Sequence, residues 1–127
     1  MFSIFKQSSS KILFLVAVTS FCCLSSSTIA DTMSLSQTEI EQKIQALPQW
    51  EQQDQTLTRT FKFKNFVESV DFVKRLVEPA EAAGHHPDIA ISYNRVTISL
   101  TTHDAGGLTQ KDFDLAKQIS LVGRLNK

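Results

Sequence analysis

Cysteine is nearly absent from this chain of 127 residues, and the only two, Cys22 and Cys23, stand side by side near its beginning. A domain that begins after them contains no thiol, so disulfide bonds and cysteine nucleophiles are excluded from it. A surplus of charge is also lacking, because 13 basic residues balance 13 acidic ones. This balance indicates no polyanionic partner, and we expect no direct binding of nucleic acid. The four glycines form no phosphate-binding loop.

The first thirty residues contain no acid. Lys6 and Lys11 precede an apolar run over residues 12–24, and small residues follow up to Ala30. This arrangement is typical of a signal- or transit-like leader. We therefore predict a leader over residues 1–30, directing the chain to export or to an organelle, and one domain over residues 31–127.

Other interpretations of the leader stay open. The apolar run is too short for a comfortable membrane span, so we expect no stable membrane anchor. If translation begins at Met33 instead, the protein would be cytoplasmic.

The apolar spacing of the remaining chain alternates between the periods of helices and strands. Ser36 and Glu39 form a capping-box signature before a helix that Pro48 ends. A short extended piece is predicted from Trp50, and alternation over residues 57–64 predicts a half-buried strand.

A second helix is predicted after Asn65, which can cap it, and Gly84 suits its C-terminal end. Pro79 lies late in this pattern and predicts a kink or a restart. The helix is expected to bury one apolar stripe, made of Phe66, Val70, Val73, Val77 and Ala80.

Two further alternating runs, over residues 89–93 and 96–101, predict a hairpin with its turn at Asn94–Arg95. Tyr93 shares the parity of the isoleucines before it, so core packing is expected for it. Thr109 can cap a last helix. The order is α-β-β-α-β-β-α, which predicts an α+β fold with a four-stranded antiparallel sheet and helices packed on one face.

Histidine is scarcer than glycine, but its placement is informative. The chain has three, His85, His86 and His103. Pro87 biases His86 toward an extended conformation, in which neighbouring side chains point in opposite directions. His103 follows the last predicted strand, so it could meet the adjacent pair at one end of the sheet.

A histidine cluster suits proton transfer. The ordinary pKa of histidine, about 6.5, allows it to give and to take protons near neutral pH. Glu81 and Asp104 are close in sequence to the histidines, and an acid together with a base suits a reaction such as the elimination of water.

Each of these residues could also have a purely structural role. Asp112 stands three residues after Thr109 and could simply complete a helix cap.

A metal site is the sharpest alternative. Glu81 and His85 are four residues apart, which can present two ligands on one helical face, and His103 could add a third. Pro79 and Gly84 make a regular helix through this stretch doubtful. We therefore predict no metal.

The residues also match a known multi-part motif. Glu81-x-x-x-His85-His86-Pro87, followed by Tyr93, His103 and Asp112, resembles the signature of the pterin-4a-carbinolamine dehydratase family. Segments around the motif are similar as well, and the resemblance extends from about Leu35 to the C-terminus.

The resemblance implies a hydro-lyase that dehydrates 4a-hydroxytetrahydrobiopterin to a quinonoid dihydropterin, in the regeneration of tetrahydrobiopterin. It implies no cofactor, a homodimer or homotetramer, and an aromatic amino acid hydroxylase as source of the substrate and candidate partner. A non-catalytic dimerisation or regulatory module on the same fold is the alternative.

Residue roles follow from the same resemblance. The expected catalytic residues are His85, His86 and His103. The expected substrate-binding residues are Glu81, His86, Pro87 and Asp104, and the expected supporting residues are Tyr93 and Asp112.

Overall fold

The computed structural model describes residues 33–125, so the leader predicted over residues 1–30 lies outside the described residues. The elements in chain order are α1 (Gln37–Ile44), β1 (Glu51–Gln53), β2 (Thr56–Lys62), α2 (Phe66–Ala83), β3 (Asp88–Ser92), β4 (Arg95–Leu100), the short 3₁₀ helix η2 (His103–Ala105) and α3 (Gln110–Arg124). The predicted order and the α+β class are confirmed.

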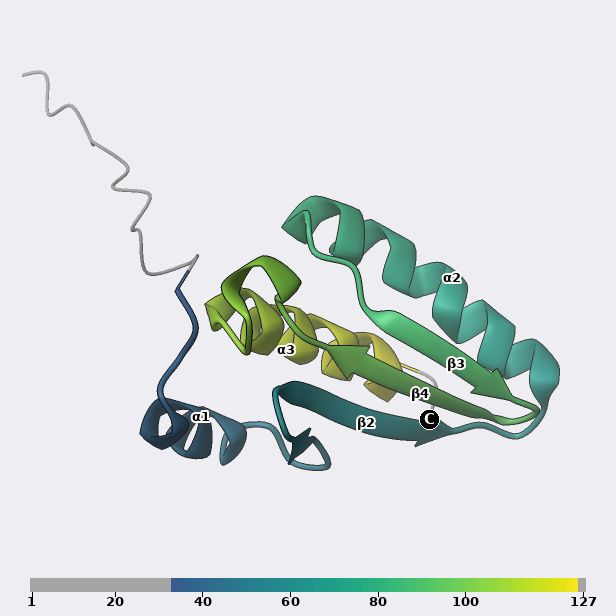
Figure 1. Ribbon diagram of the computed structural model, residues 1–127. Coiled ribbons are helices and arrows are strands. Elements are labelled where there is room, and N and C mark those ends of the chain that lie inside the picture. Colours follow the sequence, from purple (N-terminus) through teal and green to yellow (C-terminus); the bar gives the residue numbers. More distant parts are fainter. Residues whose placement is uncertain (1–32, 126–127) are drawn as a thin grey trace, which may run out of the picture.

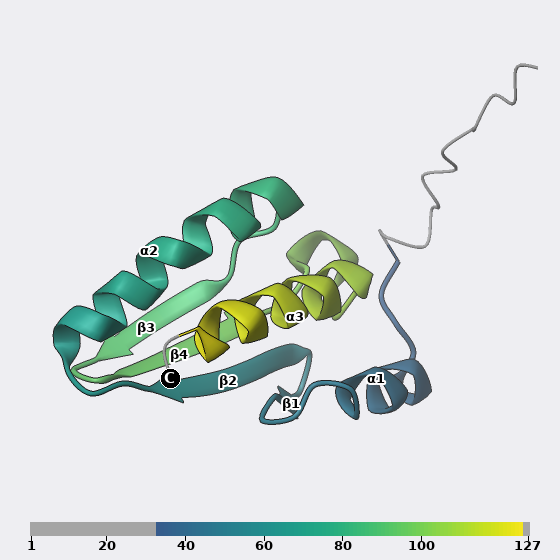
Figure 2. The ribbon, with the colours of Figure 1, turned by 180° about the vertical axis from the view of Figure 1, so that it is seen from behind.

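The four strands form one antiparallel sheet in the order β1-β2-β4-β3. Helices α2 and α3 lie side by side over one face of this sheet, whereas α1 lies beside its β1 end (Figures 1 and 2). Strands β2 and β4 are therefore central and covered by helices, and β1 and β3 are edges. This arrangement brings the end of α2, the end of β4 and the start of α3 to one end of the molecule (Figure 1).

The core lies between the central strands and the two covering helices. Alternation along β4 turns Val96, Ile98 and Leu100 toward the helices, and all three are fully buried. The ring of Phe72 in α2 packs on Phe61 of β2, with 4.7 Å between centroids. Burying each such side chain stabilises the fold by about 1.5–3 kcal/mol, which fixes where the ends of α2 and β4 lie.

Helix α2 differs from its prediction in two respects. Its buried stripe is formed by Ser69, Phe72, Leu76 and Ala80. The predicted stripe was right in part, since Ala80 is buried and Val73 packs against the core, but Phe66 and Val77 are 53% and 59% exposed. The apolar residues of α2 fit two neighbouring stripes about 100° apart, and the polar Ser69 hides the buried one.

The second difference concerns Pro79, where no kink or restart interrupts the helix. It lies inside α2, which runs unbroken to Ala83, while Leu76 and Ala80 pack in the core on either side of it. Gly84 ends the helix in the left-handed conformation, with φ +55°, as predicted.

The hairpin of β3 and β4 turns one residue earlier than predicted, at Tyr93 and Asn94. Tyr93 has φ +52° and is 67% exposed, so its expected core packing was wrong. The reason is the position of β3, an edge strand whose five residues are all exposed because the helices cover the central strands. Asn94 anchors the turn, since its Nδ2 donates to the carbonyl of Phe63.

No helix within residues 33–125 is long and apolar enough to span a membrane.

Candidate active site

The site is built around a buried carboxylate at the start of α3. The side chain of Asp112 has no exposure to solvent. Its Oδ2 accepts the backbone N–H of Thr109 at 2.7 Å, which caps α3 as predicted. The hydroxyl of Thr102 donates to the same oxygen at 2.8 Å, and Thr109 Oγ1 lies 3.2 Å from it. The cap therefore uses one carboxylate oxygen and leaves the other available.

The second oxygen of Asp112 contacts the first histidine of the motif. His85 Nε2 lies 2.7 Å from Asp112 Oδ1, and the imidazole is only 12% exposed. The left-handed turn at Gly84 directs the chain toward α3, and His85 N donates to the carbonyl of Ala80. A carboxylate without a proton can only accept, so in that state of Asp112 Nε2 donates the hydrogen, and a ring that carries a single hydrogen then keeps a lone pair on Nδ1.

His86 points elsewhere, as its extended backbone predicts. Its Nε2 lies 2.9 Å from Glu81 Oε1, and the two side chains are 63% and 69% exposed. The adjacent histidines therefore occupy different environments, one against a buried carboxylate and the other on the surface. The unbroken α2 carries Glu81 in its last turn, within reach of His86.

His103 opens η2, three residues after the end of the last strand, and its side chain is exposed. Its imidazole makes no hydrogen bond with another residue in the described range 33–125. The neighbouring Thr102 contacts Asp112, and η2 lies at the same end of the molecule as the segment between α2 and β3 (Figures 1 and 2). The fold thus places the three histidines at one end, where His85 and His86 contact different carboxylates and His103 contacts neither of them.

The remaining residues of the motif take no part in the contacts described above. Asp104 is exposed on η2, and Pro87 is half-buried just before β3. Tyr93 lies at the far end of the hairpin, because five residues of β3 separate it from Pro87. The six steps from Pro87 to Tyr93, at about 3.4 Å each, correspond to roughly 20 Å, so the fold of one chain does not bring Tyr93 to the histidines.

Thr102 is the residue of the site that sequence reasoning missed. Its hydroxyl contacts both Asp112 Oδ2 and Thr109 Oγ1, at 2.8 and 2.9 Å. Threonine next to a motif histidine carries no specific signal in the sequence, because the hydroxyl is useful only once the strand end and the helix start have met.

The geometry also bears on the metal alternative. Glu81 contacts His86 rather than His85, the residue four positions away that a helical pair of ligands would need. Among residues 33–125, no three histidine, cysteine, aspartate or glutamate side chains are grouped so that they could hold a metal ion.

Comparison with known proteins identifies the family. The family model described as pterin 4 alpha carbinolamine dehydratase matches residues 33–122. The chain belongs to this family. The resemblance seen in the sequence is therefore confirmed, and the family name denotes a dehydratase, an enzyme of the hydro-lyase class.

Similar proteins align with this chain over most of their own lengths. A protein of Picosynechococcus sp., named as a candidate pterin-4-alpha-carbinolamine dehydratase, is 66% identical over 82 residues, which are 65% of this chain and 89% of that protein. A protein of Cyanothece sp. with the same name is 64% identical over 91 residues, covering 72% and 94%. The crystal structure of a transcriptional coactivator/pterin dehydratase from Brucella melitensis is 33% identical, has a TM-score of 0.68, and aligns with 71% of this chain and 98% of that one.

Proposed function

We propose that this protein dehydrates a 4a-hydroxytetrahydropterin to the quinonoid dihydropterin and water, as a step in the regeneration of tetrahydrobiopterin. The observation that carries the proposal is the pair of His85 and Asp112, at the same end of the fold as His86 and His103. Family membership supplies the substrate class. An aromatic amino acid hydroxylase is the class of enzyme that would produce this substrate and is a candidate partner.

The reaction requires two proton transfers and no redox change. The carbon–oxygen bond at the hydroxylated ring carbon breaks, the oxygen keeps the electron pair, and a proton from an acid completes the water molecule. A base removes the proton of the adjacent ring nitrogen, whose electrons form the new carbon–nitrogen double bond. Histidine side chains suit both transfers, because they exchange protons near neutral pH.

His85 is proposed as the proton acceptor. Asp112 holds the tautomer that carries its hydrogen on Nε2, and this leaves Nδ1 ready to take a proton. His103 is proposed as the donor, since its exposed imidazole has no other hydrogen-bond partner within residues 33–125. His86 is proposed to bind the substrate, with Glu81 fixing its orientation. Pro87 and Asp104 are proposed to border the same site.

Stopped-flow measurement of the dehydration tests the proposal. A 4a-hydroxytetrahydropterin, generated by a hydroxylase and mixed with the full-length protein, should lose water much faster than it does without the protein. His85→Ala and His103→Ala should each reduce the rate by about a hundredfold or more, the usual contribution of one acid or base. Lys74→Ala, a change of an exposed residue in the middle of α2, is the control and should keep the rate. Folded wild-type protein that leaves the uncatalysed rate unchanged would refute the dehydratase.

A non-catalytic dimerisation or regulatory module is the second candidate. It is favoured by the name of the Brucella melitensis relative, which describes that protein as a coactivator as well as a dehydratase. A triple alanine variant of the three histidines separates the two functions in the source organism. Full biological function of the variant would favour the module, and its loss would favour the enzyme.

We also propose that the protein forms a homodimer or a homotetramer. Within residues 33–125, strand β3 is an edge whose backbone pairs only with β4, and its exposed residues include Ile89 and Ile91. An exposed apolar edge strand can pair with a second copy of itself. Light scattering coupled to size exclusion should give a multiple of the chain mass, and Ile91→Lys should reduce it. A wild-type protein that is monomeric at high concentration would contradict the proposal.

A further inference from the structure

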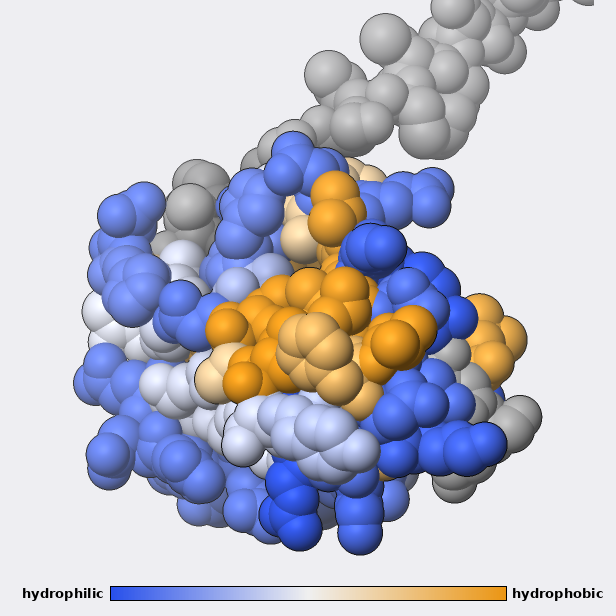
Figure 3. Space-filling view, turned by 90° about the vertical axis from the view of Figure 1, so that its right-hand side faces the viewer, coloured by the Kyte–Doolittle hydropathy of each residue, from blue (hydrophilic) through white to orange (hydrophobic). Residues whose placement is uncertain are grey.

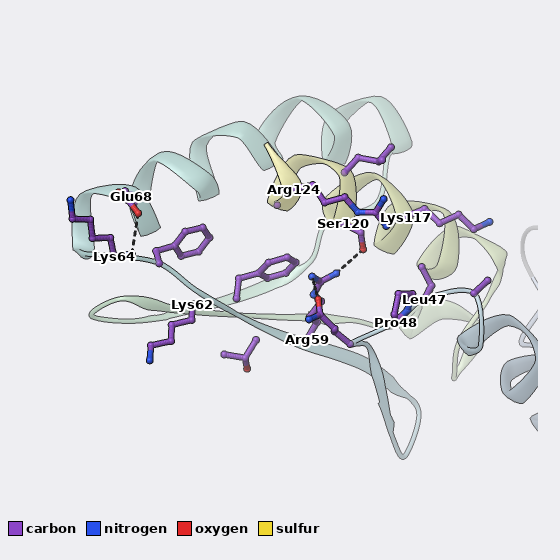
Figure 4. Close-up of a pocket in the computed structure, with 16 residues that line it drawn as sticks. Leu47, Pro48, Arg59, Lys62, Lys64, Glu68, Lys117, Ser120 and Arg124 are labelled. Carbon is purple, nitrogen blue, oxygen red and sulfur yellow. Dashed lines mark hydrogen bonds between the residues drawn. The ribbon is translucent and has the colours of Figure 1, made fainter. Parts of the chain in front are cut away.

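A cavity of about 1050 Å³ lies away from the histidines, between the end of β2 and the last turns of α3 (Figure 4). Asp112 lies near the start of α3, whereas Ser120 and Arg124 border the cavity near its end. At about 1.5 Å per residue, these eight to twelve residues correspond to roughly 12–18 Å. The cavity is therefore separate from the site described above, and the histidine site does not account for the residues that line it.

Arg59 reaches into this cavity and has no acidic partner in the described part of the chain. It projects from β2 toward α3, whereas Lys62 points away from the helices (Figure 4). Its guanidinium is half-buried and donates to Ser120 Oγ at 3.0 Å and to Gln49 Oε1 at 2.5 Å, both neutral acceptors. A guanidinium has five N–H donors, so three of them have no acceptor among residues 33–125. These spare donors are free to bind an acceptor that enters the cavity.

A second arginine borders the same space. Burial lowers the pKa of Arg59, and the positive charge of Arg124 lowers that pKa further. Arg124 itself forms no ion pair within the described part of the chain. Two like charges at one cavity repel each other, and an oxyanion between them would remove the repulsion and occupy the spare donors. Glu68, the one acid among the lining residues that the structure describes, is already engaged, since its Oε2 accepts the backbone N–H of Lys64.

Lys62, Lys64 and Lys117 also border the cavity, and one part of its lining is apolar and shaped by close contacts. Phe61 lies under the Arg59 guanidinium, 4.1 Å from ring centroid to Cζ, and Phe63 and Leu121 also border the cavity. A methyl group at Gly123 would come within 2.5 Å of the Phe61 ring, so glycine is required there although it is a poor helix former. Apolar surface gathers on the end of the molecule where α2 begins (Figure 3). The cavity thus offers two arginines, with three lysines at its border, beside an apolar wall.

We propose that this cavity binds a small organic oxyanion, in which a carboxylate or phosphate group is attached to an apolar or aromatic body. The two guanidinium groups would bind the oxyanion, and the phenylalanine wall would bind the body. The N-terminal thirty residues are a poor occupant, because they contain no acid to pair with the arginines. The proposal does not depend on the dehydratase activity.

Titration of the ¹⁵N-labelled full-length protein tests it. Phenyl phosphate and benzoate distinguish the two oxyanions, inorganic phosphate lacks the body, and benzyl alcohol lacks the charge. We expect one or both aromatic anions to shift the amide signals of residues 59–63 and 117–124 with saturation, and to bind more tightly than inorganic phosphate or benzyl alcohol. Arg59→Gln and Arg124→Gln should each weaken binding about tenfold or more, the usual effect of losing a charged hydrogen-bond donor.

Two controls make the result decisive. Lys74→Gln removes one positive charge from the exposed face of α2, and its binding should equal that of the wild type. Arg124→Gln removes no intramolecular hydrogen bond among residues 33–125, so it should fold even if Arg59→Gln does not. No saturable shift with either aromatic anion, or an equal loss of binding in Lys74→Gln, would overturn the proposal. Equal binding of inorganic phosphate would overturn the role of the apolar wall.

Discussion

The imidazole of His85 and the carboxylate of Asp112 lie 27 residues apart in sequence and 2.7 Å apart in space, and this contact joins the end of α2 to the start of α3. The same carboxylate caps α3 through its other oxygen. One residue therefore has a structural and a positioning task, each performed by a different atom. Substitutions that change one oxygen and not the other should separate stability from activity.

Asp112→Asn should damage activity more than stability. The amide oxygen can still accept from Thr109 N, so the cap of α3 is retained, while the NH₂ group faces His85. An NH₂ group donates, which forces the hydrogen of His85 onto Nδ1 and removes the proposed lone pair. The dehydration rate should fall about a hundredfold or more, by analogy with the loss of a tautomer-fixing aspartate. Stopped-flow rates measured beside thermal unfolding check this. An unchanged rate in folded Asp112→Asn would refute the positioning role.

Thr102→Val should reduce stability more than activity. Valine keeps the shape of threonine but removes the hydroxyl that donates to Asp112 Oδ2 at 2.8 Å. A buried carboxylate that loses one donor should cost about 1–3 kcal/mol in the free energy of unfolding. The contact of Asp112 Oδ1 with His85 is untouched, so the rate should fall less than in Asp112→Asn. Urea unfolding and the dehydration assay measure the two effects. Thr101→Val is a neighbouring control whose hydroxyl donates instead to the Gln55 carbonyl.

The order of the elements was predictable because the apolar periods of the strands and of α3 are strong and consistent. The hydroxyl and carboxylate caps at Ser36 and Asp112 were equally predictable, since a cap depends on residues only three positions apart. Gly84 belongs to the same class, because a left-handed C-terminal residue favours glycine.

Features that depend on the position of an element in the fold were not predictable in this way. The isoleucines of β3 and Tyr93 alternate like core residues, yet β3 is an uncovered edge strand. The contact of His85 with Asp112 and the hydroxyl of Thr102 require three distant segments to meet. The pair of Arg59 and Arg124 likewise arises only when β2 packs beside the end of α3.

Ser36→Ala should reduce stability in a manner that depends on pH. The Ser36 hydroxyl and backbone hold the pKa of Glu39 below its ordinary value of 4.5. A carboxylate with a lowered pKa in the folded state stabilises the fold above the ordinary pKa, and this stabilisation is lost as the pH falls through the lowered value. The variant should therefore unfold a few degrees below the wild type at pH 7, with a smaller gap at pH 3. Ser34→Ala, which removes an exposed serine outside the helix, is the control. A gap that does not shrink in acid would contradict this account.

Glu81→Gln should separate substrate binding from structure. The contact between Glu81 Oε1 and His86 Nε2 is exposed, so its loss should change the free energy of unfolding by less than about 1 kcal/mol. If the pair orients His86 toward a pterin, the variant should raise KM several-fold and change kcat little. Glu78→Gln removes an equal charge from α2 one turn earlier and should leave KM unchanged. An unchanged KM in both variants would remove Glu81 from the site, and an equal rise in both would assign the effect to the charge of the helix rather than to the contact with His86.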